Sequence, residues 1–268
     1  MEDEQVNVRA SVVKSLKSVG LYHPLRRVKQ RLSFMVKVKV DPDAAHHFAV
    51  TAQDAKVRLE CFRTVVSELK ARGPVRDYLE FGVCRGVTLS LMHQVLQEQG
   101  LTESRIFGFD SFEGLPAEAE HDDEGTWYPG QFMSSLPSTR KFLVKQGVDM
   151  GKTHLVKGWF SDTLTAEFAR TVRPSIIMVD CDMYLSARQC LDWSLPLVED
   201  RAVIIFDDWN SRKLAERGLG ERKAWEEASA NNPELRIVKE LPAYIPEAYV
   251  VLVEREREDT GRLRNRLQ

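Results

Sequence analysis

Short apolar runs, separated by polar or glycine-containing segments, are the most regular feature of the chain. Two of them, residues 175–179 (SIIMV) and 202–206 (AVIIF), are unbroken and rich in β-branched side chains. Runs of this length and composition are typical of strands buried on both faces, as in a parallel sheet. The same pattern predicts further strands at 78–81, 105–109, 154–157, 235–238 and 249–253.

Helical periodicity fills the intervals between these runs. Between residues 54 and 71, apolar side chains recur four positions apart, which is the spacing of one helix face; they are Val57, Cys61, Val65 and Leu69. Further helices are predicted at 87–99, 138–146, 163–172 and 186–195, and over most of 212–231. The acidic and aromatic segment 117–135 lacks such a period, and we expect a non-regular loop on the substrate side.

This alternation of strands and helices predicts a doubly wound α/β domain. In such a domain the ligand lies across the carboxyl ends of the strands, where the strand order reverses. The 268 residues can hold this domain together with an added segment. We expect an N-terminal helical lid at 1–53, the main domain at 54–255 and a charged C-terminal tail at 256–268.

Acidic residues directly follow the two unbroken runs. Asp180 and Asp182 come after the first run, and Asp207 and Asp208 come after the second. If the two strands are neighbours, about 4.8 Å apart, the four carboxylates converge and raise each other's pKa. A divalent cation such as Mg²⁺ would relieve this repulsion, because hard metals prefer carboxylate ligands. The alternative is that one or two of these acids only cap the helices that follow.

A glycine turn and a second acid indicate a nucleotide-containing cofactor. The turn from Gly82 to Gly86 connects a predicted strand to a helix, so that bare backbone N–H groups can approach a ligand. Asp110 ends the next strand, where a carboxylate can accept hydrogen bonds from ribose hydroxyls. Trp159 follows the third strand, and it either stacks on an adenine ring or fills the core.

Composition and charge narrow the class of protein. With 43% hydrophobic residues the chain can build a full core without disulfides, and its four cysteines form no CxxC pair. A formal net charge of −2 argues against a nucleic-acid partner. The first residues are too polar for a signal peptide, and no apolar run reaches membrane length. We therefore expect a cytoplasmic protein with no membrane partner.

Read together, five stretches resemble the class I S-adenosylmethionine-dependent methyltransferases. Among these, the chain is most similar to the macrocin and demethyldecarbamoylnovobiocin O-methyltransferase family. The matching stretches are 80–83 (EFGV), 109–116 (FDSFEGLP), 157–164 (KGWFSDTL), 179–184 (VDCDMY) and 206–208 (FDD). The chain departs from the family at Trp209-Asn210, where members usually carry tyrosine and glycine, and this difference bears on the acceptor pocket.

The resemblance implies a Rossmann-like class I methyltransferase sheet that binds S-adenosylmethionine and Mg²⁺ or a similar divalent cation. It implies that Asp180, Asp207 and Asp208 hold the cation and that Asp182 is the general base, although the spacing fits Asp182 as a base, a metal ligand or both. The implied cofactor residues are Glu80, Gly82, Gly86, Thr88, Asp110, Ser111, Phe112, Gly158, Trp159 and Asp162. The implied acceptor is a sugar hydroxyl on a small-molecule glycoside or polyketide-type natural product, and the family is compatible with a homo-oligomer.

Three other functions fit part of this pattern. A metal-dependent O-methyltransferase of a catechol or other phenol would use the same acids beside an aromatic acceptor pocket. A non-catalytic binding protein would keep the methyltransferase fold, although the intact acids argue against it. A nicotinamide oxidoreductase would also need a glycine turn, but hydride transfer gives the paired acids no task.

Overall fold

The computed structural model describes residues 52–256. The predicted lid at 1–53 therefore lies outside the described residues except for its last two positions, and the predicted tail does so beyond residue 256. Within the described part of the chain, no helix is both long enough and apolar enough to cross a membrane.

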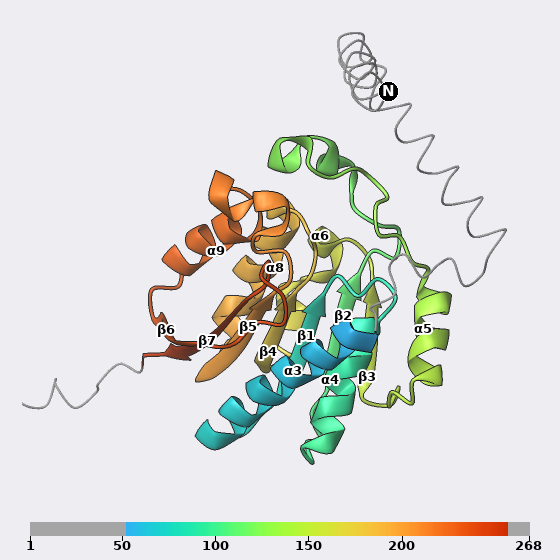
Figure 1. Cartoon of the computed structure of the whole chain (residues 1–268), viewed down its shortest axis with the longest axis vertical. Helices are drawn as coiled ribbons and strands as arrows, with labels where there is room; N and C mark the ends of the chain where they lie inside the picture. Colours follow the sequence, from blue (N-terminus) through green and yellow to red (C-terminus); the bar gives the residue numbers. More distant parts are fainter. Residues whose placement is uncertain (1–51, 257–268) are drawn as a thin grey trace, which may run out of the picture. The chain divides into compact units, whose positions relative to one another are not determined.

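The described residues form a seven-stranded sheet with helices on both faces (Figure 1). The strands are β1 (Asp77–Phe81), β2 (Ile106–Asp110), β3 (Thr153–Lys157), β4 (Pro174–Val179), β5 (Arg201–Phe206), β6 (Leu235–Glu240) and β7 (Tyr249–Arg255). Their order is β3-β2-β1-β4-β5-β7-β6; β7 pairs antiparallel with both β5 and β6, and the other pairs are parallel. The predicted doubly wound α/β fold is confirmed, and the strand order reverses between β1 and β4.

Helices cover the two faces of this sheet. They are α3 (Ala52–Arg72), α4 (Val87–Glu98), α5 (Leu136–Lys145), α6 (Phe160–Thr163), α7 (Ala166–Ala169), α8 (Tyr184–Ser194) and α9 (Gly220–Ala230). Short 3₁₀ turns lie at Ala117–Glu120, Asp122–Gly125, Leu195–Leu197, Ser211–Lys213 and Ala215–Arg217. The pattern of apolar residues therefore located α3, α4, α5 and α8 to within two residues at each end.

Two hydrophobic cores explain the long apolar runs in β4 and β5. Along β4, Ile176 and Met178 pack with α3, α4 and α5, whereas Ile177 and Val179 pack with α8 and α9. All four side chains are fully buried. Burying an isoleucine or valine side chain stabilises the fold by roughly 1.5–3 kcal/mol, so a strand between two helical layers favours apolar residues on both of its faces.

Two of the predicted helices are wrong in extent. Residues 163–172 do not form one helix, because the hydroxyl of Thr165 accepts a hydrogen bond from the Phe168 N–H at 3.1 Å and begins the separate helix α7. The stretch 212–219 is built of 3₁₀ turns, and the regular helix begins only at Gly220. Segment 117–135, predicted to be non-regular, contains two short 3₁₀ turns.

Candidate functional site

A cavity of about 750 Å³ opens at the carboxyl ends of the central strands. Its walls come from the loops that follow β1 to β5, and it lies at the point where the strand order reverses. This volume lies within the usual range of small-molecule sites. The predicted site residues that line it are Gly82, Asp110, Ser111, Gly158, Trp159, Asp180, Asp182, Asp207 and Asp208.

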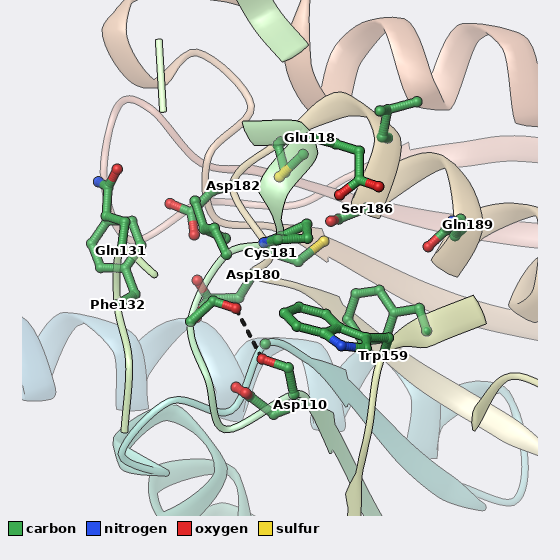
Figure 2. A pocket seen from close by; sticks show the side chains of 18 of the residues that line it. Asp110, Glu118, Gln131, Phe132, Trp159, Asp180, Cys181, Asp182, Ser186 and Gln189 are labelled. Carbon is green, nitrogen blue, oxygen red and sulfur yellow. Dashed lines mark hydrogen bonds between the residues drawn. The ribbon is translucent and has the colours of Figure 1, made fainter. Parts of the chain in front are cut away.

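The two acidic strand tips lie side by side, as predicted. β4 and β5 pair in parallel, with Val179 opposite Phe206. One carboxylate oxygen from each of Asp180, Asp207 and Asp208 lies within 4.8 Å of the others. Asp182 lines the same cavity, and Figure 2 shows its side chain above that of Asp180.

Burial and mutual repulsion both act on the acidic tips. The pKa of Asp180 is raised well above its ordinary value, first by burial and then by the nearby charges of Asp207 and Asp208. The pKa of Asp182 is raised in the same way. Burial, with Asp207 as the next cause, raises the pKa of Asp208 to about 7. A set of carboxylate oxygens in this electrostatic state fits a hard divalent cation.

A guanidinium of the chain also reaches this cluster. The Nη1 of Arg58, in α3, donates to Oδ1 of Asp207 at 2.8 Å, and the hydroxyl of Tyr244 donates to the same oxygen. The guanidinium lies 4.2 Å from the centroid of the Tyr244 ring. Arg58 therefore relieves part of the acidic repulsion without an ion, which the argument from charge alone did not anticipate. The available signal was a charged residue four positions before Phe62, on the buried face of the helix.

Two fully buried glutamates lie close to the cluster without lining the cavity. Glu80 accepts a hydrogen bond from the Tyr78 hydroxyl at 2.5 Å, and burial raises its pKa to about 8. Glu221, in α9, accepts one from the Asp208 N–H at 3.1 Å. Each has a second carboxylate oxygen without a hydrogen-bond partner in the described part of the chain. Glu80 had been predicted as a cofactor residue, whereas Glu221 had not been predicted at all.

Asp110 joins the loops that follow β1 and β2. Its carboxylate accepts hydrogen bonds from the N–H groups of Cys84, at 2.7 Å, and Phe112, at 2.5 Å. Both of these residues have a left-handed backbone, which is uncommon outside glycine and clusters at functional sites. At Gly82 a Cβ atom would lie 1.7 Å from the carbonyl oxygen of Asp180, so only glycine fits there.

The remaining predicted cofactor residues do not line the cavity. Gly86 precedes α4, Thr88 and Phe112 are buried, and Asp162 lies in α6; their roles remain predictions. Trp159 differs from them because its side chain forms part of the cavity wall with an exposed fraction of 37%. That exposure favours ligand stacking over the alternative of core filling, and Figure 2 shows the ring beside Asp110.

Comparison with known proteins gives a consistent picture. The profile of the family described as Macrocin-O-methyltransferase (TylF) matches residues 25–230. Over 158 residues the chain is 30% identical to the 8-demethyl-8-(2,3-dimethoxy-alpha-L-rhamnosyl)-tetracenomycin-C 4'-O-methyltransferase of Streptomyces olivaceus. Over 163 residues it is 25% identical to demethyldecarbamoylnovobiocin O-methyltransferase of Streptomyces niveus. Each match covers 57% of this chain and 60% of the relative, so it spans less than two thirds of those proteins.

Solved structures share the fold at lower identity. The O-methyltransferase NovP has a TM-score of 0.61 and 23% identity over 75% of this chain and 80% of its own. The calicheamicin methyltransferase CalS11 has a TM-score of 0.56 and 19% identity over 87% and 92%. These similarities confirm the predicted class I methyltransferase sheet.

Proposed function

The chain belongs to the macrocin O-methyltransferase family, and we propose that it is a cation-dependent enzyme that methylates a sugar hydroxyl of a natural product. The methyl donor in this proposal is S-adenosylmethionine. The observation that carries it is the cluster of Asp180, Asp207 and Asp208 beside a cavity that also contains Asp110 and Trp159. The names of the relatives support the acceptor class, since the Streptomyces olivaceus enzyme methylates a rhamnosyl derivative of tetracenomycin.

The cofactor residues have clear tasks in this proposal. Asp110 would bind the ribose hydroxyls, Trp159 would stack on the adenine and the loop at Gly82 would border the methionine part. The sulfonium group of the bound cofactor supplies an already activated methyl group. What the chain must add is alignment, and a well-oriented acceptor can lower the barrier by up to about 7–11 kcal/mol.

In this proposal Asp182 removes the proton from the acceptor hydroxyl. A sugar hydroxyl is a very weak acid, so a carboxylate alone has little driving force to deprotonate it. Asp180, Asp207 and Asp208 would hold a divalent cation, whose positive charge would make such a hydroxyl more acidic. Asp182 lines the cavity beside these acids, where its carboxylate could take up the proton as general base.

Methyl transfer from labelled S-adenosylmethionine to a panel of glycosylated polyketides and simple phenols tests the proposal. We expect methylated glycosides, loss of turnover with a chelator and recovery with Mg²⁺. Methylation of phenols alone would support a catechol-type enzyme. Full activity after chelation would make the acidic cluster structural, and lack of affinity for the cofactor would favour a binding protein.

A further inference from the structure

The first turn of α9 is hydrogen-bonded both to the tip of β5 and to the segment 117–135. The Gly220 N–H donates to Oδ1 of Asp123 at 2.8 Å, which connects the turn to the segment 117–135. On its next residue, Oε2 of Glu221 accepts the Asp208 N–H at 3.1 Å. Glu221 is fully buried, and its Oε1 has no hydrogen-bond partner within residues 52–256. The turn is therefore bonded to the tip of β5 on one side and to Asp123 on the other.

Asp123 in turn holds the start of α8. It is buried, with 4% of its surface exposed, and its Oδ2 accepts the Tyr184 N–H at 2.9 Å. One carboxylate thus caps both α8 and α9, and neither helix has a side-chain cap of its own. Negative charge is favourable at a helix N-terminus, so a single acid can stabilise both ends. The neighbouring Asp122 adds a bond from the Leu185 N–H at 2.8 Å.

Asp182 lies two residues before the first residue of α8. Tyr184 is two residues further along the chain, and Asp182 has a left-handed backbone with φ of 67°. A non-glycine residue keeps such a conformation only where its surroundings determine it. The fully buried side chain of Met183 and the bond between Tyr184 and Asp123 supply that constraint. Hydrogen bonds and short stretches of chain therefore lead from Asp182 through Asp123, Gly220 and Glu221 to Asp208.

We propose that Asp123 and Glu221 form a buried clamp that sets the spacing of the two acidic strand tips. They are positioning residues, because neither lines the cavity. The clamp would tune the affinity of Asp180, Asp207 and Asp208 for a cation and would orient Asp182. This inference rests on the proposed function of those acids.

Graded variants test the clamp. In Glu221→Ala and Asp123→Ala, we expect Mn²⁺ affinity, measured by electron paramagnetic resonance, to fall about 10- to 100-fold, as for outer-shell residues of metal sites. Affinity for S-adenosylhomocysteine, measured by calorimetry, should stay unchanged. Glu221→Gln keeps an acceptor for the Asp208 N–H and should restore most of the Mn²⁺ affinity. Asp123→Asn keeps one acceptor oxygen for two N–H groups and should lie between Asp123→Ala and the wild type.

Asp77→Asn is the matched control, because Asp77 is also a buried acid that joins separate segments. It accepts two bonds from the Arg105 guanidinium and one from the Arg173 N–H, at the opposite end of the sheet. This variant should lose thermal stability while its Mn²⁺ affinity stays at the wild-type value. Equal Mn²⁺ affinity in the wild type and both alanine variants would overturn the clamp.

Amide hydrogen exchange separates failure of the clamp from failure of the proposed function. Both alanine variants should exchange faster at 180–184 and 207–210, with or without a cation, and Asp77→Asn should not. If the wild type binds no Mn²⁺, the proposal of a cation-dependent function is wrong. The clamp is then tested by the exchange rates alone. Unchanged exchange in these two segments would then overturn it.

Discussion

The two ends of the sheet differ in how far their acidic side chains are paired with basic ones. At the amino ends of the strands, acids and arginines are matched: Asp77 pairs with Arg105, and Glu199 receives both Arg76 and Arg173. At the carboxyl ends, five aspartates line one cavity, and Arg58 is hydrogen-bonded to one of them. The paired end is what folding stability alone would favour, since a buried charge is costly unless it is paired.

The excess of acid therefore indicates function at the carboxyl end. Residues that break the rules of stable packing are expected where a protein binds or reacts. The left-handed backbones of Cys84, Phe112 and Asp182 also lie at this end and are a second sign of function. The carboxyl end is also where an α/β sheet binds its ligand. Changes at each end of the sheet can break or sharpen the contrast.

Asp182→Asn should have the largest effect. The asparagine amide has nearly the same shape as the carboxylate, but it cannot take up the proton of the acceptor hydroxyl. We therefore expect kcat to fall about 10²- to 10⁴-fold. Affinity for S-adenosylhomocysteine should stay at the wild-type value, because Asp110 and Trp159 are unchanged. Turnover of labelled methyl groups and a calorimetric titration measure the two quantities.

A surface aspartate provides the control for this change. Asp149 accepts a bond from the Gly151 N–H in an exposed turn, and Asp149→Asn should keep wild-type turnover. Undiminished methyl transfer in Asp182→Asn would remove Asp182 from the mechanism and weaken the functional meaning of the acidic end.

The sequence predicted the sheet well because its signals are local. The strands at 175–179 and 202–206 were located to within a residue, since full burial on both faces favours a run of apolar side chains. The convergence of Asp180, Asp207 and Asp208 followed from the parallel arrangement alone. Trp159 could be placed near a ligand but not distinguished from a core residue, because both environments accept an aromatic ring.

The partners of the acids could not be predicted, because they depend on contacts between segments far apart in the chain. Arg58 meets Asp207 across 149 positions, and Asp123 meets Gly220 across 97. The rotation of α3 and the path of the 117–135 segment decide these contacts, and no period in the sequence encodes either of them. Glu221 lies in a charged stretch, where one buried acid has no distinct pattern.

The free energy of unfolding, measured as a function of pH, should show how much the ionisation of a buried glutamate destabilises the carboxyl end. Burial raises the pKa of Glu80 from 4.5 to about 8, so the folded state keeps a proton that the unfolded state has lost. Without a cation, the unfolding free energy should therefore fall as pH rises from about 4.5 to 8. Glu80→Gln cannot ionise, and it should remove on the order of 3 kcal/mol of this fall.

Urea unfolding at pH 4.5 and pH 8 measures this difference. The Gln variant keeps an acceptor for the Tyr78 hydroxyl, so its stability should be close to wild type at pH 4.5 and higher than wild type at pH 8. Parallel losses of stability in the two proteins would mean that Glu80 is paired or hydrated in solution. The destabilisation by negative charge at the carboxyl end would then come from the aspartates alone.

The smallest effect, and the most direct comparison of the two ends, comes from removing one arginine at each. Arg58→Met keeps much of the apolar stem but leaves Asp207 without its ion pair, and we expect a loss of about 2 kcal/mol in the absence of a cation. Arg105→Met does the same to Asp77. Because the Arg105 side chain is 42% exposed, about 1 kcal/mol should be lost there.

The two variants should then respond differently to Mg²⁺, measured as the rise in Tm on saturation. Mg²⁺ supplies positive charge to the cluster that Arg58 has left, so Arg58→Met should gain more than the wild type and recover most of its loss. Arg105→Met should gain the same as the wild type, because Asp77 lies at the far end of the strands. Equal gains in both variants would mean that the ion does not act at Asp207, and the acids at the carboxyl end would need another explanation.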